Sequence, residues 1–215
     1  MKSKQKNVNL LKNLLKRLPE GQFNLQENSL IFPFFGQENA FPGSNEFRLI
    51  DLRSSQQKLS FVDHVATGET INSVSTQIEQ AQGLYPYVQR SDLNGAYVIE
   101  SYENQENPLQ ADYVECTFRL KPTDSHNDVF VAGGFNNFTF NAPLRLNPAT
   151  GFLENTQMLK QGIYNYQFKS KNPPNVVLEG NYAQTENLYE VLVYYQKPGT
   201  RYDSLVGYTT VVTSR

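Results

Sequence analysis

The residues best suited to form a nucleophile and its base are the single cysteine, Cys116, and the two histidines, His64 and His126. A thiol becomes a useful nucleophile when a neighbouring base takes its proton and a third group orients that base. Neither histidine belongs to a nucleophile motif such as Gly-x-Ser-x-Gly. Cys116 takes an apolar position in an alternating segment, which predicts a buried structural thiol. The sequence therefore does not favour a Cys/His enzyme.

A second candidate is the segment "TDSHND" (123–128), which places Asp124, His126 and Asp128 at alternate positions. Carboxylate oxygens and an imidazole at this spacing could ligate a metal ion, as in a metal-dependent hydrolase. The segment lies between two expected strands, where Asp, Ser and Asn are common turn residues, so we expect a turn without a metal. The "AGG" at 132–134 lacks the Lys and helix start of a phosphate-binding loop.

Paired carboxylates could support glycoside hydrolysis, and the candidates are Glu154, Glu179, Glu186 and Glu190. The separation of the two carboxyl groups defines that chemistry, and a sequence does not contain it. We expect these four residues to lie on the solvated surface of a β-sandwich.

The stretch "DVFVAGGFNNFTFNAPLRLN" (128–147) resembles in outline a turn of sugar-binding β-sandwich modules. Such modules present exposed aromatic rings, usually Trp, to stack on a sugar, whereas Phe138 stands here. Because Phe is usually buried, Phe135, Phe138 and Phe140 are better interpreted as core and corner residues. A carbohydrate-binding module remains the alternative function. The Gly133–Gly134 break then marks where the chain passes from one sheet to the other.

The composition limits the function classes. The 215 residues carry 19 Lys and Arg against 21 Asp and Glu, a net charge of −2, so no broad basic field attracts nucleic acid. A single cysteine excludes an internal disulfide. No apolar run approaches the length of a membrane-spanning helix. The basic start of the chain lacks the apolar stretch of a signal peptide.

The elements that must position these residues are mostly strands. Only residues 8–18, with leucines on one stripe before Pro19, indicate a short amphipathic helix. Alternating or apolar segments predict strands at 113–120, 162–170, 187–195 and 204–212, and residues 66–83 suggest a loop or an exposed strand pair. Strands at this spacing without intervening helices predict an antiparallel β-sandwich.

The polar, Pro-containing segment at 103–110 is the best candidate domain boundary. We therefore expect a partial, irregular β-rich unit with the short N-terminal helix at 1–107 and a complete sandwich at 108–215.

Several blocks carry a resemblance to a known family. These are "FPGSNEFRLIDLRS" (41–54), "ADYVECTFRL" (111–120), "MLKQGIYNYQF" (158–168) and "EGNYAQTENLYEVLVYYQKPGTRYDSLVGYTTV" (179–211). The chain resembles the plug protein family of the type IX secretion system, from about residue 27 to its C-terminus. Members of that family have a signal peptide and a further N-terminal domain, so the resemblance implies the C-terminal half of such a protein.

The resemblance implies an Ig-like, E-set-type sandwich without enzymatic activity, catalytic residue, cofactor or metal. It also implies a periplasmic protein associated with the outer membrane, which closes the periplasmic opening of an outer-membrane translocon barrel. That barrel is the expected partner, and no nucleic acid or small-molecule substrate is expected. The family has no motif that assigns interface residues here.

The segment "YYQKPGTRYDSLVGY" (194–208) is the most specific part of the resemblance. Pro198–Gly199 predicts a hairpin turn. Tyr194, Tyr195, Arg201 and Tyr202 have the Tyr and Arg composition of binding hot spots, which makes them the candidate interface. The alternative is a structural corner in which Arg201 pairs with Asp203 or a strand carboxylate and the tyrosines bury their rings.

Overall fold

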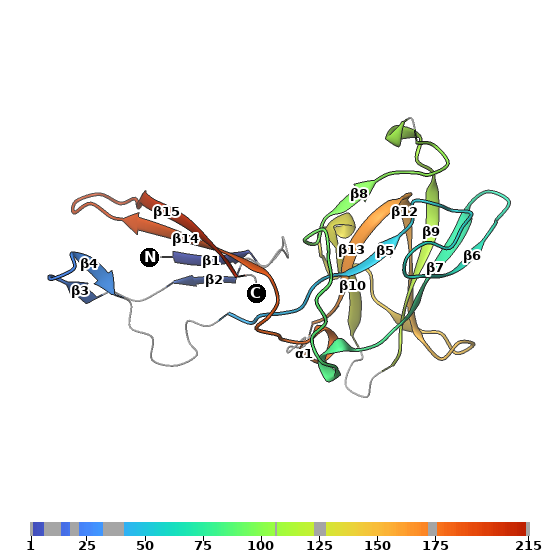
Figure 1. Cartoon of the computed structure of the whole chain (residues 1–215), viewed down its shortest axis with the longest axis horizontal. Coiled ribbons are helices and arrows are strands. Elements are labelled where there is room, and N and C mark those ends of the chain that lie inside the picture. The colour runs from blue at the N-terminus through green and yellow to red at the C-terminus, as the bar shows by residue number, and fades with distance from the viewer. Residues whose placement is uncertain are drawn as a thin grey trace. The chain divides into compact units, whose positions relative to one another are not determined.

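The computed structural model describes residues 2–6, 14–17, 22–31, 41–105, 107–122, 128–171 and 176–213. The protein is almost entirely β, which confirms the predicted fold class (Figure 1). The chain forms two compact units. One comprises Ser44–Asn181, and the other combines Met1–Gly43 with Tyr182–Arg215.

The unit Ser44–Asn181 contains two β-sheets. The first has the strand order β10-β13-β5, with β8 also paired to β13, and the second has the order β11-β12-β9-β7-β6. The strands are β5 (Arg48–Asp51), β6 (Val62–Ala66), β7 (Asn72–Glu79), β8 (Tyr97–Ile99), β9 (Tyr113–Leu120), β10 (Val129–Gly133), β11 (Arg145–Leu146), β12 (Leu153–Lys160) and β13 (Gly162–Ser170). Short helical turns are η1 (Gln82–Leu84), η2 (Pro108–Gln110), η3 (Gly134–Asn136) and α1 (Val176–Glu179).

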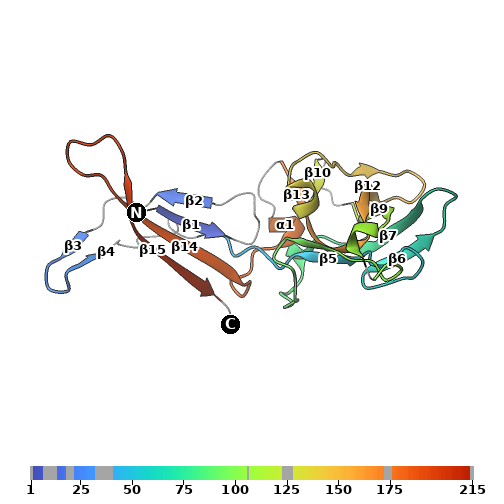
Figure 2. The same ribbon diagram turned by 90° about the horizontal axis from the view of Figure 1, so that it is seen from above.

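The hydrophobic core of this unit lies between the two sheets, which Figure 2 shows from above. Strand β9 follows the predicted alternation and buries Val114, Cys116, Phe118 and Leu120. Strand β13 contributes Tyr164, Tyr166 and Phe168 from the other sheet. The rings of Phe118 and Tyr166 meet edge to face, with their centroids 4.8 Å apart. Such aromatic contacts add to the free energy gained by burying the rings.

Strand β13 differs from its predicted alternation, because its polar side is buried as well. Asn165 is fully buried and holds the loop that precedes β8. Its Oδ1 accepts from the amides of Leu93 at 2.5 Å and Gly95 at 3.2 Å, and its Nδ2 donates to the carbonyl of Arg48 at 3.2 Å. A buried amide is tolerated where it bonds in this way. The loop that covers this face comes from a distant part of the sequence.

The predicted domain boundary at 107/108 is not the one that the structure has. Strand β7 pairs in parallel with β9, and β5 pairs with β13, so strands from both sides of residue 107 share both sheets. The polar segment at 103–110 is part of this unit: Ser54 Oγ and Gln161 Nε2 each donate to Glu103 at 2.6 Å. The polar composition of this segment predicted a linker. In the structure the polar side chains instead hydrogen-bond to one another within the unit.

The segment 66–83, predicted as a loop or an exposed strand pair, supplies the interior strand β7, which lies between β9 and β6. The β7–β9 pair is a parallel one within a fold that was predicted to be antiparallel. Parallel neighbours need a crossover connection, and here the chain passes through the other sheet between the two strands.

The second unit contains a sheet with the strand order β15-β14-β1-β2 and a small hairpin of β3 and β4. The strands are β1 (Lys2–Lys6), β2 (Leu14–Arg17), β3 (Gln22–Asn24), β4 (Ser29–Ile31), β14 (Asn187–Tyr195) and β15 (Ser204–Thr213). All the pairs are antiparallel. Strand β14, expected to be buried on both faces, is instead half-buried along most of its length.

The helix predicted at 8–18 is wrong for the part that the structure describes. Residues Leu14–Arg17 form strand β2, which pairs with β1, while residues 8–13 and 18 lie outside the described ranges. A short run of leucines and lysines fits a helix and a strand about equally well. Pairing with β1, a contact that the local pattern does not contain, decides between them.

Candidate functional site

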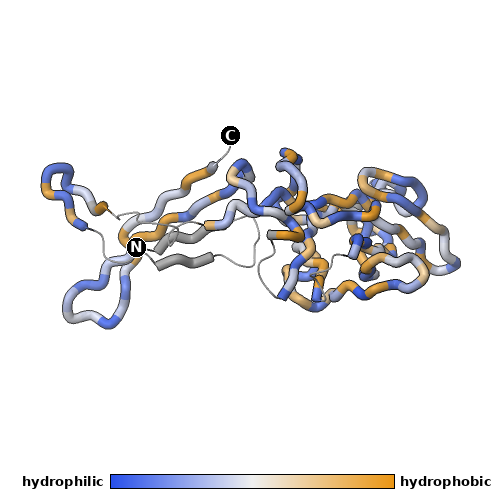
Figure 3. The backbone as a smooth tube through the Cα atoms, turned by 90° about the horizontal axis from the view of Figure 1, so that it is seen from below, coloured by the Kyte–Doolittle hydropathy of each residue, from blue (hydrophilic) through white to orange (hydrophobic). Residues whose placement is uncertain are grey.

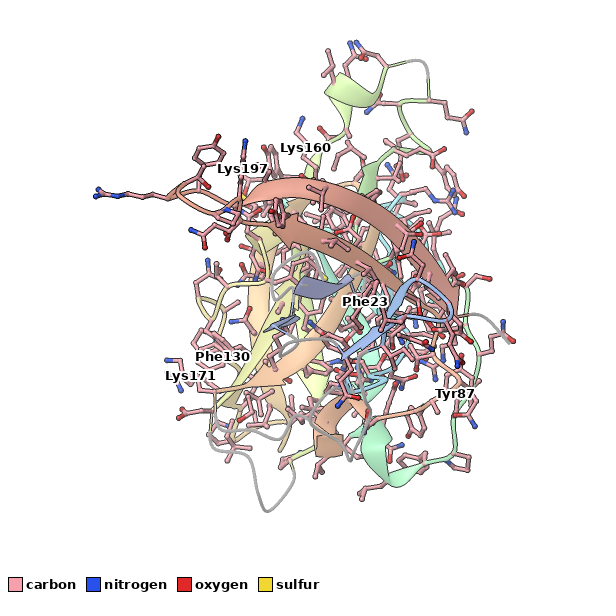
Figure 4. The ribbon with its side chains drawn as sticks, turned by 90° about the vertical axis from the view of Figure 1, so that its left-hand side faces the viewer. Phe23, Tyr87, Phe130, Lys160, Lys171 and Lys197 are labelled. Atoms are coloured by element: carbon pink, nitrogen blue, oxygen red, sulfur yellow. The ribbon has the colours of Figure 1, made fainter. Side chains whose placement is uncertain are left out.

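The predicted interface residues lie at one end of the hairpin formed by β14 and β15, next to the loop of residues 196–203 (Figure 1; Figure 4 labels Lys197 in this loop). Tyr195 is 53% exposed and Tyr202 is 66% exposed. Arg201 is also exposed, whereas Tyr194 is half-buried. The structure therefore presents three of the four predicted side chains to solvent and places the fourth at the base of the loop.

The loop has a defined backbone. Gly199 takes a φ of +85°, which a residue with a side chain adopts only with strain. The amide and the hydroxyl of Thr200 both donate to the carbonyl of Lys197, at 3.0 Å and 2.7 Å. Gln196 Nε2 donates to the carbonyl of Thr200 at 3.1 Å. These bonds hold the loop in one shape before any partner arrives, which lowers the entropy lost on binding.

The alternative, in which Arg201 pairs with Asp203 or a strand carboxylate, is not observed among the residues that the structure describes. The guanidinium of Arg201 therefore remains available to a partner carboxylate, aromatic ring or carbonyl. With Lys197 it gives this loop a positive end, offset by Asp203 alone. The arrangement suits recognition of a polar or acidic protein surface by Tyr and Arg.

Of the candidate nucleophile and its two candidate bases, the structure describes Cys116 and His64. Cys116 is fully buried in β9, and burial raises the pKa of its thiol well above the ordinary range. His64 is exposed on β6, and His126 lies outside the described residues. A thiol with a raised pKa carries almost no thiolate near neutral pH and is a poor nucleophile. The interpretation of Cys116 as a structural residue is confirmed.

Glu179 was expected at the surface, but the structure buries it against Arg48. The amide of Phe168 also donates to Glu179 Oε1, at 2.5 Å. Burial raises the pKa of Glu179, while the adjacent Arg48 opposes that shift. On the other side Arg48 Nη1 donates to Glu79 at 2.5 Å, and Tyr166 Oη donates to Glu79 at 3.3 Å. One guanidinium thus pairs with two carboxylates and connects them within the fold, which is a structural arrangement.

The other three candidate carboxylates, Glu154, Glu186 and Glu190, are not among the ion-pair partners of Arg48 in the described part of the chain. Glu154 accepts from Asn147 at 2.7 Å and from Thr150 at 2.8 Å, which closes the turn before β12. Glu190 is buried on β14, against expectation, and accepts from Tyr208 Oη at 3.2 Å. Glu186 is exposed.

The turn after β10 is a corner of the sandwich, as interpreted from the sequence. Phe138 is only 4% exposed, its ring lies 5.9 Å from that of Phe47, and Lys169 Nζ lies 5.2 Å from its centre. Phe135 stacks on Phe118 at 5.8 Å. These rings do not form an exposed platform for a sugar.

Next to this corner, the rings of Phe130 and Phe140 meet edge to face. Lys171 Nζ lies 4.9 Å from the ring centre of Phe130 (Figure 4). The chain then passes from β10 in the first sheet to β11 in the second. The predicted change of sheet at Gly133–Gly134 is therefore confirmed.

A polar cavity of about 230 Å³ lies beside the buried Arg48 cluster and was not predicted. Its wall includes Asn45, Glu79, Gln80, Gln82, Tyr85 and Arg90. Many of these groups already bond within the protein: Asn45 Nδ2 donates to the carbonyl of Glu179 at 2.8 Å, and Tyr85 Oη donates to Gln80 at 2.7 Å. Apart from Asn45, the lining residues lie within positions 78–90, and the fold of this segment against Asn45 forms the cavity.

The possible metal ligands Asp124 and His126 lie outside the described residues, and Asp128 is exposed. Within the described ranges, no group of three His, Cys, Asp or Glu side chains is placed to hold a metal ion. No helix in the same ranges is long and apolar enough to cross a bilayer.

The fold and the loop together define an all-β protein with an ordered, Tyr- and Arg-containing hairpin end. No family model matches the chain. No curated protein matches it either. A crystal structure of a hypothetical protein from Parabacteroides merdae is similar, with a TM-score of 0.77 and 28% sequence identity. The match covers 99% of this chain and 54% of that protein, so the chain spans about half the length of the solved structure.

Proposed function

We propose that this protein is a non-enzymatic plug or gating subunit that docks on the outer-membrane translocon of a type IX secretion system and closes it. The resemblance of four sequence blocks to the plug family motivates the proposal. In the structure these blocks include β5, β9, much of β13 and the β14–β15 hairpin. The resemblance thus involves elements of both compact units, and the proposed site of action is the periplasm.

The observation that carries the proposal is the exposed hairpin end with Tyr195, Arg201 and Tyr202. Tyr and Arg make large contacts with few rotatable bonds and are enriched in binding hot spots. The hydrogen bonds of Thr200 order the loop that presents them. A docking protein needs such a preorganised surface, and it needs no catalytic group.

Co-purification of the full-length protein with the translocon from detergent-solubilised outer membranes tests the proposal. We expect the wild type to be retained and the triple variant Tyr195→Ala, Arg201→Ala, Tyr202→Ala to lose at least about tenfold in retention, because hot-spot truncations often exceed 1.4 kcal/mol. Tyr113→Ala, at a 53% exposed tyrosine of the other unit, is the control and should be retained.

A deletion strain provides the second measurement. Loss of the protein should make the outer membrane leakier to a large dye or antibiotic, because the translocon opening is no longer closed. The plug function is wrong if deletion removes no component from the purified translocon and leaves the membrane equally tight.

A further inference from the structure

Strand β15 lies at the end of its sheet and has one unpaired edge among the described strands. It spans ten residues, Ser204–Thr213, in the order β15-β14-β1-β2. It pairs with β14 along nearly its whole length, with one register shift at Val206. The opposite edge therefore presents a row of backbone amides and carbonyls that can extend the sheet by another strand.

The composition of β15 favours such pairing. Its sequence, "SLVGYTTVVT", contains no charged residue and no proline, and six of its ten residues are β-branched. Its apolar side chains are exposed: Leu205 53%, Val206 58%, Tyr208 59%, Val211 50% and Val212 56%. Figure 3 shows hydrophobic colour along this strand, which leads to the C-terminus. Because side chains alternate along a strand, the exposed apolar groups lie on both faces of the sheet.

The two edge strands of the five-stranded sheet in the other unit are protected. At one end of the five-stranded sheet, β6 carries the exposed Asp63 and His64 and has an irregular register with β7. At the other end, β11 has only two residues, and one of them is Arg145. Charge, irregularity and shortness are the usual means of keeping an edge from pairing with another chain. Strand β15 carries no charge and is ten residues long, and its one irregularity is a register shift near its start, where Val206 has no partner on β14. The stretch Gly207–Thr213 is regular and uncharged, so it can accept another strand.

We propose that β15 pairs antiparallel with β15 of a second copy across a two-fold axis, so that the two sheets continue into one. The inference does not depend on the proposed plug function. Antiparallel pairing of a strand with its own copy uses one edge of each protein, so it closes at a dimer. Since β15 lacks charges, no register opposes like charges, which would destabilise the pair. With the axis at Thr209, for example, Gly207 of one copy faces Val211 of the other.

Sedimentation velocity of the whole chain over a range of concentrations tests the dimer. We expect the wild type to dimerise and Val206→Lys, Val211→Lys to dissociate at least about tenfold more readily, because lysines on an edge strand oppose pairing. The control carries two lysines at exposed positions of the other unit, Met158→Lys and Leu109→Lys, which are 62% and 83% exposed. It should dimerise like the wild type. A monomeric wild type, or a β15 variant that dimerises equally well, overturns the proposal.

Cysteine cross-linking gives a readout that does not require the lysine variant to fold. At the axis the paired Cα atoms lie about 4.5–5.5 Å apart, which a disulfide can bridge. Thr209→Cys should therefore cross-link under mild oxidation, while Met158→Cys should not; the native Cys116 is fully buried and stays unreacted. Tyr208→Cys and Thr210→Cys test an axis moved by one residue. No cross-linking above the Met158→Cys control at all three positions overturns the proposal.

The same variants separate this inference from the plug function. If the wild type is monomeric and Val206→Lys, Val211→Lys abolishes co-purification with the translocon, the edge accepts a strand of the translocon and the second copy is excluded. If the protein dimerises through β15 but does not bind the translocon, the dimer stands and the plug function fails.

Discussion

Arg48 donates from Nε to both carboxylate oxygens of Glu179, at 3.1 Å each, where both side chains are shielded from solvent. Its Nη2 donates to the carbonyls of Gln80 at 2.9 Å and Leu178 at 3.2 Å. Burial alone would lower the pKa of Arg48, but Glu179 and Glu79 raise it, so the guanidinium stays charged. Its guanidinium also lies 4.9 Å from the ring centre of Phe168 on β13, so one side chain on β5 connects β7, β13 and α1.

Arg48→Met should destabilise the protein by about 3–5 kcal/mol, because it leaves two carboxylates without their cation in a buried place. Urea unfolding followed by circular dichroism measures the change in unfolding free energy. Lys197→Met, at an exposed position in the hairpin loop, is the control and should change stability by less than about 0.5 kcal/mol. A loss below about 1 kcal/mol for Arg48→Met would show that the cluster does not hold the strands together.

Glu103 should make stability depend on pH in the acid range. Burial acts to raise its pKa, but hydrogen bonds from Ser54 and Gln161 outweigh burial and lower it below the ordinary value of 4.5. The folded state then binds fewer protons than the unfolded chain. The stabilisation is present above pH 4.5 and is lost as the pH falls through the lower, folded-state pKa.

We therefore expect Glu103→Gln to cost stability at pH 7 and to cost less at pH 3, with the two unfolding curves converging as the pH falls. Ser54→Ala removes one donor and should reduce the pH dependence part of the way. Parallel curves for the wild type and Glu103→Gln between pH 7 and pH 3 would refute this assignment.

Cys116 should be unreactive in the folded protein. Its thiol is fully buried, so a reagent cannot reach it, and burial raises its pKa, so almost no thiolate forms. Titration with a thiol reagent at pH 8 should show no reaction over minutes in buffer and one equivalent after unfolding in urea. Rapid reaction of the native protein would indicate an accessible thiolate and reopen the question of a cysteine-based activity.

Gly133→Ala should destabilise the corner after β10 by about 1–3 kcal/mol through overpacking. The backbone there is extended, with a φ of −157°, so alanine meets no torsional barrier. The added methyl carbon, however, would lie 2.6 Å from the carbonyl oxygen of Asn165 and 2.5 Å from the ring of Phe135.

Gly207→Ala is the matched control, because its methyl group would meet only Val193, at 3.4 Å. We expect it to change the thermal midpoint little. If the two alanine variants have equal thermal midpoints, the corner accommodates the extra methyl group without cost. The steric explanation of Gly133 would then fail.

Some features of this protein could be predicted because neighbouring residues determine them. The alternation at 113–120 predicts which side of β9 is buried, since successive side chains of a strand point to opposite faces. Pro198–Gly199 predicts the turn between β14 and β15, and Gly133–Gly134 predicts the change of sheet. The uncharged run at 204–213 is also visible in the sequence, although its place at a sheet edge is not.

The remaining features depend on residues that are far apart in the chain. Strand β7 joins β9 across the predicted domain boundary, and Arg48 meets Glu179 across 131 positions of sequence. The burial of Asn165 depends on the loop at 93–95. The leucines of 14–17 lie in a strand because β1 pairs with them. A local pattern specifies which face of a segment is apolar, but the neighbouring strand that covers the face or pairs with the edge is decided only by tertiary structure.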